Sequence, residues 1–287
     1  MEGRVPSFSR GQFLRFELLQ SINLNGSVGV PSEDRVGCTT TQAWVVDGAT
    51  DLGKPGLLSS GGGSAWIANS VHQYLYRSHE QSIETTCQRL FHFLEDSFQV
   101  EKTRDPLGDW EIPSAAFLLA EIANNSLNFA SAADCSALVI SGSSVEQIGG
   151  ALDSTTETTE ARSFGPGIAA AQNRSEDVTQ NRRSKRVRGR YAALTTDANL
   201  SANATRFGSC AIRLGDNVLL MSDGFSCLLD RYSLYTKEGL GATLFAEGLA
   251  GLAIEIRNTE LQDPEGWQFP RFKVSDDMSA LWLRVVD

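Results

Sequence analysis

Acidic residues recur where short strand-like runs of this chain meet turns. They stand at Glu33-Asp34, Asp47-Gly48, Asp223-Gly224 and Asp276-Asp277. Hard divalent cations prefer oxygen ligands, and a glycine after an aspartate lets the backbone turn sharply and expose a carbonyl. A single Asp-Gly pair is more often only a turn. Four such acidic sites in one chain, in this order, are much harder to explain as turns alone and favour a role in binding divalent cations.

The hydrophobic pattern predicts an α+β layered fold rather than regular βαβ units. Apolar residues at helical spacing predict helices over 64–75, 83–100 and 240–257. Strand-like runs occur at 42–46, 115–122, 126–132, 136–140, 209–213, 217–221 and 280–286. The stretch 153–197 differs from these, because it is polar at first and strongly basic over 182–190. We interpret it as a flap insertion.

Composition narrows the function classes. A net charge of -10 argues against a general nucleic-acid binder. No run approaches the roughly 18 apolar residues of a membrane span, and the first residues lack the pattern of a signal peptide. The five cysteines are odd in number and far apart, which disfavours zinc and predicts free thiols in the cytoplasm. The sequence does not predict an oligomeric state.

The acidic motifs resemble, in order and spacing, those of the type 2C metal-dependent serine/threonine protein phosphatases, in a bacterial-like form. The resemblance runs from about residue 20 to the C-terminus and rests on Ser32-Glu33-Asp34-Arg35, Trp44-Val45-Val46-Asp47-Gly48-Ala49-Thr50, Ala132-Ala133-Asp134-Cys135-Ser136, Leu220-Met221-Ser222-Asp223-Gly224-Phe225 and Ser275-Asp276-Asp277-Met278-Ser279-Ala280. The third motif is weak, since only Asp134 survives from the family's Gly-Asp-Ser-Arg.

The resemblance implies a single domain over 1–287, built as a four-layer α-β-β-α sandwich of two antiparallel sheets flanked by helices. It also implies a centre of two Mg²⁺ or Mn²⁺ ions, with a weaker third ion. By this resemblance Asp47 would bridge the two ions and take part directly in catalysis, and Asp34 would orient the attacking water. The other metal positions implied are Glu33, the Gly48 carbonyl, Asp134, Asp223 and Asp276. For Asp134 a structural role is equally expected, and Asp277 is expected to support the site rather than bind metal.

The implied activity is hydrolysis of phosphoserine or phosphothreonine in a phosphorylated protein substrate. Metal-activated water would attack in line, without a covalent intermediate. Two alternatives stay open: a hydrolase of the same fold acting on a small phosphate ester, and a non-catalytic domain that binds a phosphorylated partner. Because a binding module would not need the metal carboxylates, their presence favours catalysis.

Two family features are missing. The arginine that many members carry four residues before the glutamate is Gly29 here, and the histidine that often follows Asp-Gly is Ala49. Arg35 is the candidate substitute for binding the substrate phosphate, although a structural ion pair is the more common role of such a residue.

The basic run 182–190 is expected to be a solvated flap segment. The alternatives are a nucleic-acid patch or a phosphate-steering surface beside the site, with Arg183 or Arg186 as a rival phosphate ligand. His72, His79 and His92 lie in no motif and are expected on helix surfaces.

Overall fold

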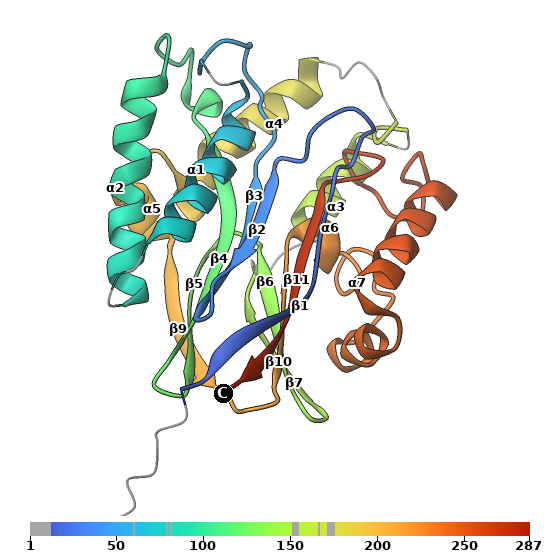
Figure 1. Cartoon of the computed structure of the whole chain (residues 1–287). Coiled ribbons are helices and arrows are strands. Elements are labelled where there is room, and N and C mark those ends of the chain that lie inside the picture. Colours follow the sequence, from blue (N-terminus) through green and yellow to red (C-terminus); the bar gives the residue numbers. More distant parts are fainter. Residues whose placement is uncertain are drawn as a thin grey trace, which may run out of the picture.

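Two antiparallel sheets lie face to face, and helices cover both outer faces (Figure 1). The computed structural model describes residues 13–59, 61–78, 80, 82–150, 155–165, 167–170 and 176–287. The predicted four-layer α-β-β-α sandwich is therefore confirmed.

The two sheets are built from distant parts of the chain. The first has the order β1 (Arg15–Leu24), β11 (Met278–Val286), β10 (Asn217–Met221), β6 (Ser136–Ser141) and β7 (Ser144–Gly149). The second has the order β2 (Asp34–Cys38), β3 (Gln42–Gly48), β4 (Ser114–Ala123), β5 (Ser126–Ala132) and β9 (Arg206–Ala211), with β8 (Leu194–Thr195) paired to β4.

Strand β3 explains why the layers hold together. Its residues 43–46 are fully buried, and successive side chains of a strand point to opposite faces. Trp44 and Val46 pack under the helices that cover the second sheet, whereas Ala43 and Val45 pack into the core between the two sheets. A strand that is covered on both faces reads as an unbroken apolar run, which is why the sequence predicts it well.

Three helices cover the second sheet: α1 (Gly63–Arg77), α2 (Ile83–Glu101) and α5 (Ala198–Ala204). The start of α2 is determined by its local sequence. For example, Ser82 Oγ accepts a hydrogen bond from the Thr85 backbone amide at 3.3 Å and begins α2. A single 3-10 turn, η1 (Asp109–Glu111), precedes β4.

The first sheet is covered by α6 (Asp223–Ser226) and α7 (Lys237–Gln262). Helix α7 is longer than the predicted 240–257 and kinks at Gly248, where φ is 69°. Among the described residues α7 is the one helix with the length and hydropathy of a membrane span. Leu240, Leu244, Leu252 and Ile256 nevertheless pack into the core over the first sheet, as in the core helix of a globular domain.

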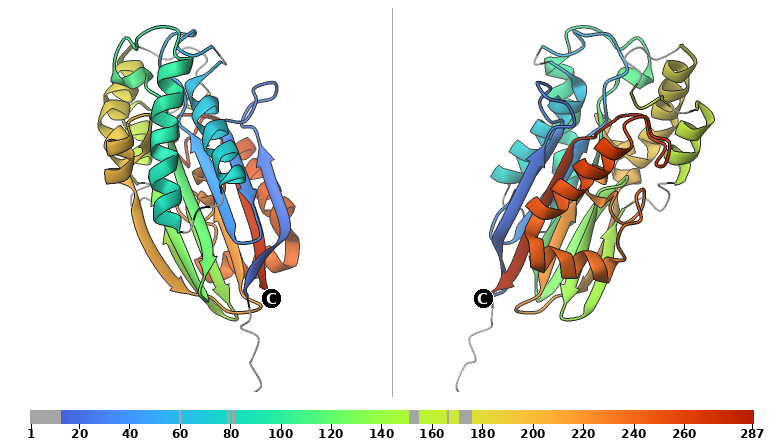
Figure 2. Two further views of the ribbon diagram at one scale, coloured as in Figure 1. Left: turned by 60° about the vertical axis from the view of Figure 1, so that its left-hand side comes forward. Right: turned by 90° about the vertical axis from the view of Figure 1, so that its right-hand side faces the viewer.

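The predicted flap contains two helices at the end of the sandwich where β3 and β10 end (Figures 1 and 2). They are α3 (Thr155–Ser163) and α4 (Glu176–Gly189), followed by a 3-10 turn, η2 (Arg190–Ala192). Ala161 and Val178 of the two helices pack on Phe272, which anchors them. The flap ends before the predicted residue 197, because 194–195 already form β8. We call α3 and α4 together the flap helices.

Candidate active site and metal centre

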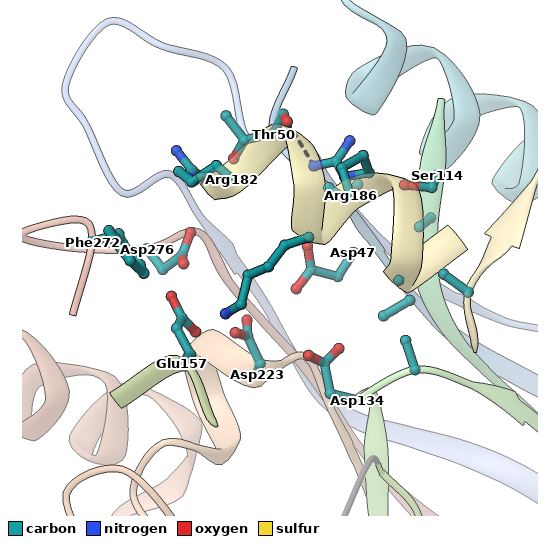
Figure 3. A pocket seen from close by; sticks show the side chains of 18 of the residues that line it. Asp47, Thr50, Ser114, Asp134, Glu157, Arg182, Arg186, Asp223, Phe272 and Asp276 are labelled. Carbon is teal, nitrogen blue, oxygen red and sulfur yellow. Dashed lines mark hydrogen bonds between the residues drawn. The ribbon is translucent and has the colours of Figure 1, made fainter. Parts of the chain in front are cut away.

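A cavity of about 380 Å³ opens at this end of the sandwich. Asp47, Asp134, Asp223 and Asp276 line it from the side of the sheets, and Glu157, Arg182, Lys185 and Arg186 line it from the flap helices (Figure 3). The four aspartates come from the end of β3, the turn between β5 and β6, the start of α6 and the loop before β11. The structure thus brings together strand ends that lie far apart in the sequence.

Asp34 lies behind this cavity, opposite Asp47 on the neighbouring strand. Its side chain is fully buried, and neither carboxylate oxygen has a hydrogen bond of ordinary geometry in the described part of the chain, although the Ser222 and Ser279 hydroxyls lie near enough to lower its pKa. A buried carboxylate without a partner is costly, so such a group points to a missing cation or to a neutral acid. We call Asp34 and the four cavity aspartates the carboxylate cluster.

Two glycines allow the chain segments to approach one another at the cavity. A Cβ on Gly48 would lie 2.4 Å from the Ser64 carbonyl oxygen, and a Cβ on Gly224 would lie 1.9 Å from the Asp277 carbonyl oxygen. Both distances are far below van der Waals contact. The glycine of each Asp-Gly pair is therefore required by close backbone packing and not by the sharp turn expected from the sequence, since Gly48 ends β3, Gly224 lies in α6 and neither has a positive φ.

Burial and mutual repulsion raise most pKa values in the carboxylate cluster. Burial, reinforced by neighbouring aspartates, raises the pKa of Asp47 and of Asp223 well above the ordinary value. Burial likewise raises the pKa of Asp34 to about 7 and that of Asp134 to about 6. The cluster therefore has more negative charge than its surroundings compensate.

Two basic side chains offset part of this charge. Lys273 Nζ lies 2.6 Å from Asp276 Oδ1 and, although burial opposes ionisation, lowers the pKa of Asp276. Arg231 Nη2 lies 3.6 Å from Asp223 Oδ2. Asp34 and Asp47 have no such ion pair among the described residues, so they are the carboxylates that most need a further cation.

The donor set fits hard divalent cations. It consists of buried carboxylate oxygens, which suit Mg²⁺ or Mn²⁺. In the part of the chain that the structure describes, no three acidic, histidine or cysteine side chains already converge on one point. Metal binding would require the carboxylates to close in.

Glu33 and Asp277 lie beside the cavity rather than in its lining. Glu33 Oε1 accepts a hydrogen bond from Ser64 Oγ, and the Glu33 carbonyl accepts from the Gly48 amide at 3.3 Å. Asp277 accepts from the Glu33 amide at 2.6 Å and from the Gly26 amide at 2.7 Å. Asp277 thus supports the loop that carries Glu33, as expected.

Arg35 does not reach the cavity, so the structure does not support it as the phosphate ligand. Its Nε donates to Asn69 Oδ1 at 2.6 Å, and its Nη1 donates to the Ser32 carbonyl at 2.7 Å. Asp34 and Arg35 are successive residues of β2, so their side chains point to opposite faces. With Asp34 toward the carboxylate cluster, Arg35 instead connects β2 to α1.

Three arginines of the basic run make contacts inside the protein, whereas Arg188 is solvent-exposed as expected for the run. Arg186 Nη2 donates to the Thr50 carbonyl at 2.8 Å, Arg183 lies 5.3 Å over the Trp110 ring, and Arg182 lies 5.8 Å over the Phe272 ring. The spacing of 182, 183 and 186 places these cations on one helix face. The spacing of these three arginines in the sequence could have predicted that one face of a helix contacts the protein, but the high charge of the run favoured a solvated segment.

Glu157 is a site residue that sequence reasoning missed. Its Oε2 lies 3.1 Å from Arg231 Nη2, and the same guanidinium approaches Asp223. No sequence motif identifies this flap contact.

The histidines are not part of the site: neither His72 nor His92 lines the cavity. His72 is half-buried and accepts a hydrogen bond from Trp44 Nε1 at 3.2 Å, and His92 is exposed as expected. His79 lies outside the described residues.

Solved structures of serine/threonine phosphatases share this architecture. The catalytic domain of the phosphatase PstP, solved in complex with two manganese ions, matches with a TM-score of 0.55 and 15% identity over 96% of this chain and 100% of that chain. PstP/Ppp of Mycobacterium tuberculosis matches with a TM-score of 0.56 and 16% identity over 96% and 99%. Stp1 from Staphylococcus aureus matches with a TM-score of 0.53 and 16% identity over the whole of both chains.

Sequence comparison adds no relative, because no protein-family model and no curated protein matches the chain. At this low identity the structural likeness shows the fold, and it extends over nearly the whole chain. The resemblance inferred from the acidic motifs is confirmed at that level: this chain has the fold of the type 2C serine/threonine phosphatases.

Proposed function

We propose that this protein is a metal-dependent phosphatase that hydrolyses phosphoserine or phosphothreonine in proteins. The observation that carries the proposal is the convergence of Asp47, Asp134, Asp223 and Asp276 on one cavity, within a fold shared with serine/threonine phosphatases. A domain that only bound phosphoprotein would gain nothing from burying so much negative charge, because a phosphate group is itself an anion.

The carboxylate cluster would hold two Mg²⁺ or Mn²⁺ ions. Glu33, Asp47 and the Gly48 carbonyl would form one site, and Asp223 and Asp276 would complete the other with Asp47. Asp134 would contribute to a weaker third site. When bound, such ions lower the pKa of water and neutralise charge on a transferring phosphoryl group.

The chain's own residues supply orientation and proton transfer. Asp34 lies opposite Asp47 on the neighbouring strand, and it would orient the attacking water. Arg231 holds the Asp223 carboxylate from the side, and Glu157 holds Arg231 in turn. With Ala49 where family members often have a histidine, the leaving alkoxide would take its proton from solvent.

Two observations support a phosphoprotein substrate inside the cell. The solved structures that share the fold include the serine/threonine phosphatases PstP and Stp1. All five cysteines are free thiols, which supports the expected cytoplasmic location.

Phosphate release tests the proposal. The metal-loaded protein should hydrolyse a phosphoserine or phosphothreonine peptide faster than a small aryl phosphate, judged by kcat/KM. Preference for the small ester would favour the alternative hydrolase. Tight phosphopeptide binding without any phosphate release in saturating Mn²⁺ and Mg²⁺ would favour a binding domain and refute the enzyme.

A further inference from the structure

We propose that Arg186 of flap helix α4 holds the substrate phosphate, in place of the arginine that the N-terminal part of the chain lacks at Gly29. The inference rests on the proposed phosphatase function and assigns one residue of that site. A planar guanidinium can donate two parallel hydrogen bonds to a phosphate, which explains why arginine is the usual ligand for this group.

The position of Arg186 suits this role. Its side chain is part of the cavity lining, and its Nη2 donates to the Thr50 carbonyl, three residues after Asp47 (Figure 3). Thr50 is its one hydrogen-bond acceptor among the described residues, so the other N–H groups of the guanidinium are available to a ligand.

The other cations around the cavity are already engaged. Lys185 pairs with Glu160, and Lys273 pairs with Asp276 at 2.6 Å. Arg231 pairs with Glu157 at 3.1 Å. Two further arginines, Arg182 and Arg183, lie over aromatic rings, and Arg183 does not line the cavity.

Arg186 differs from the lysines and from Arg231 because the described residues form no salt bridge with it, and it differs from Arg182 and Arg183 because it does not lie over an aromatic ring among the described residues, although it is half-buried. Asp51, Glu33 and Asp47 are the acidic groups whose charges act on it from a distance. A buried guanidinium without a direct carboxylate partner is costly. An anionic ligand bridging the cavity would relieve this cost.

The test compares Arg186→Gln with Arg188→Gln. Glutamine at 186 keeps an N–H donor for the Thr50 carbonyl but removes the charge and the planar fork. Arg188 is exposed on the same helix, lies outside the cavity lining, and is the matched control. Binding of inorganic phosphate to the Mn²⁺-loaded protein should weaken roughly ten- to a hundredfold in Arg186→Gln and less than about twofold in Arg188→Gln.

Hydrolysis should change in the same way. Arg186→Gln should raise KM for a phosphopeptide more than it lowers kcat, and Arg186→Lys should restore part of the affinity because it restores the charge. A purely structural role would lower Tm without changing phosphate affinity, so thermal unfolding is measured on every variant. Equal phosphate affinity in Arg186→Gln and Arg188→Gln would overturn the inference.

The phosphate measurement also separates this inference from the proposed function. If the wild-type protein hydrolyses no phosphorylated substrate, the proposed function fails, yet phosphate binding still reports on Arg186. If the wild type is an active phosphatase and Arg186→Gln binds phosphate normally, only the inference about Arg186 fails.

Discussion

Replacing Asp34 with asparagine is expected to stabilise the metal-free protein strongly at pH 8 and much less at pH 5. In the folded protein, burial first and then the charges of Asp276 and Asp277 raise the pKa of Asp34 from 3.8 to about 7. The unfolded chain releases this proton near pH 3.8, whereas the folded protein retains it until about pH 7. Folding stability is therefore lost as the pH rises between these values.

The size of the effect follows from the two pKa values. Each pKa unit corresponds to about 1.4 kcal/mol, so the wild type loses on the order of 4 kcal/mol by pH 8 and less than half of that by pH 5. Asparagine has a similar shape and no proton to release, so the variant does not lose this stability. Because Asp34 interacts with Asp47 and the rest of the carboxylate cluster, about 4 kcal/mol is an upper value.

Urea unfolding in EDTA at pH 5 and pH 8 measures the effect. Asp96→Asn is the control, since Asp96 is exposed on α2 and its replacement should leave the pH dependence unchanged. Added Mn²⁺ should reduce or reverse the advantage of Asp34→Asn, because the ions neutralise the cluster. Parallel pH profiles for the wild type and Asp34→Asn in EDTA would refute the reasoning.

Four other substitutions test separate parts of the site. Asp47→Asn and Asp223→Asn should each lower kcat at saturating Mn²⁺ by roughly a hundredfold or more without changing the circular dichroism spectrum; near-normal turnover would contradict their assignment as metal ligands. Lys273→Gln removes an ammonium from the carboxylate cluster and should tighten Mn²⁺ binding by about tenfold, or about 1.4 kcal/mol, in calorimetry; unchanged or weaker binding would contradict this. Gly224→Ala places a methyl group 1.9 Å from a backbone carbonyl oxygen and should lower the free energy of unfolding by about 1–3 kcal/mol. Gly189→Ala is the control: Gly189 has helical φ and ψ and nothing within 4 Å, so alanine there should leave the free energy of unfolding unchanged or raise it by up to about 1 kcal/mol.

The sequence predicts the strands and the acidic residues at their ends because both depend on local patterns, whereas the four-layer sandwich and the meeting of the carboxylates were expected from the family resemblance. Trp44 and Val45 belong to an apolar run that only a strand covered on both faces requires. Asp47 and Asp223 each end such a run, so they had to lie at strand ends. Strand alternation also explains why Arg35 points away from Asp34.

The flap contacts could not be predicted in the same way, because they join residues far apart in the chain. Arg186 donates to Thr50, which lies 136 residues earlier, and Glu157 meets Arg231 across 74 residues. A charged surface helix and a charged helix that covers a cavity have the same composition. What distinguishes them is the acidic, partly aromatic surface beneath, and that surface exists only in the folded chain.

The central claim is that divalent cations bound by the carboxylate cluster make this protein a phosphatase. The most direct test titrates Mn²⁺ into metal-stripped protein and measures bound metal and phosphate release from a phosphoserine peptide in the same samples. We predict no release without metal and activity that rises with occupancy to a plateau near two ions per chain, by the two-metal mechanism. Full turnover in the stripped protein, or two bound ions without phosphate release, would contradict the claim.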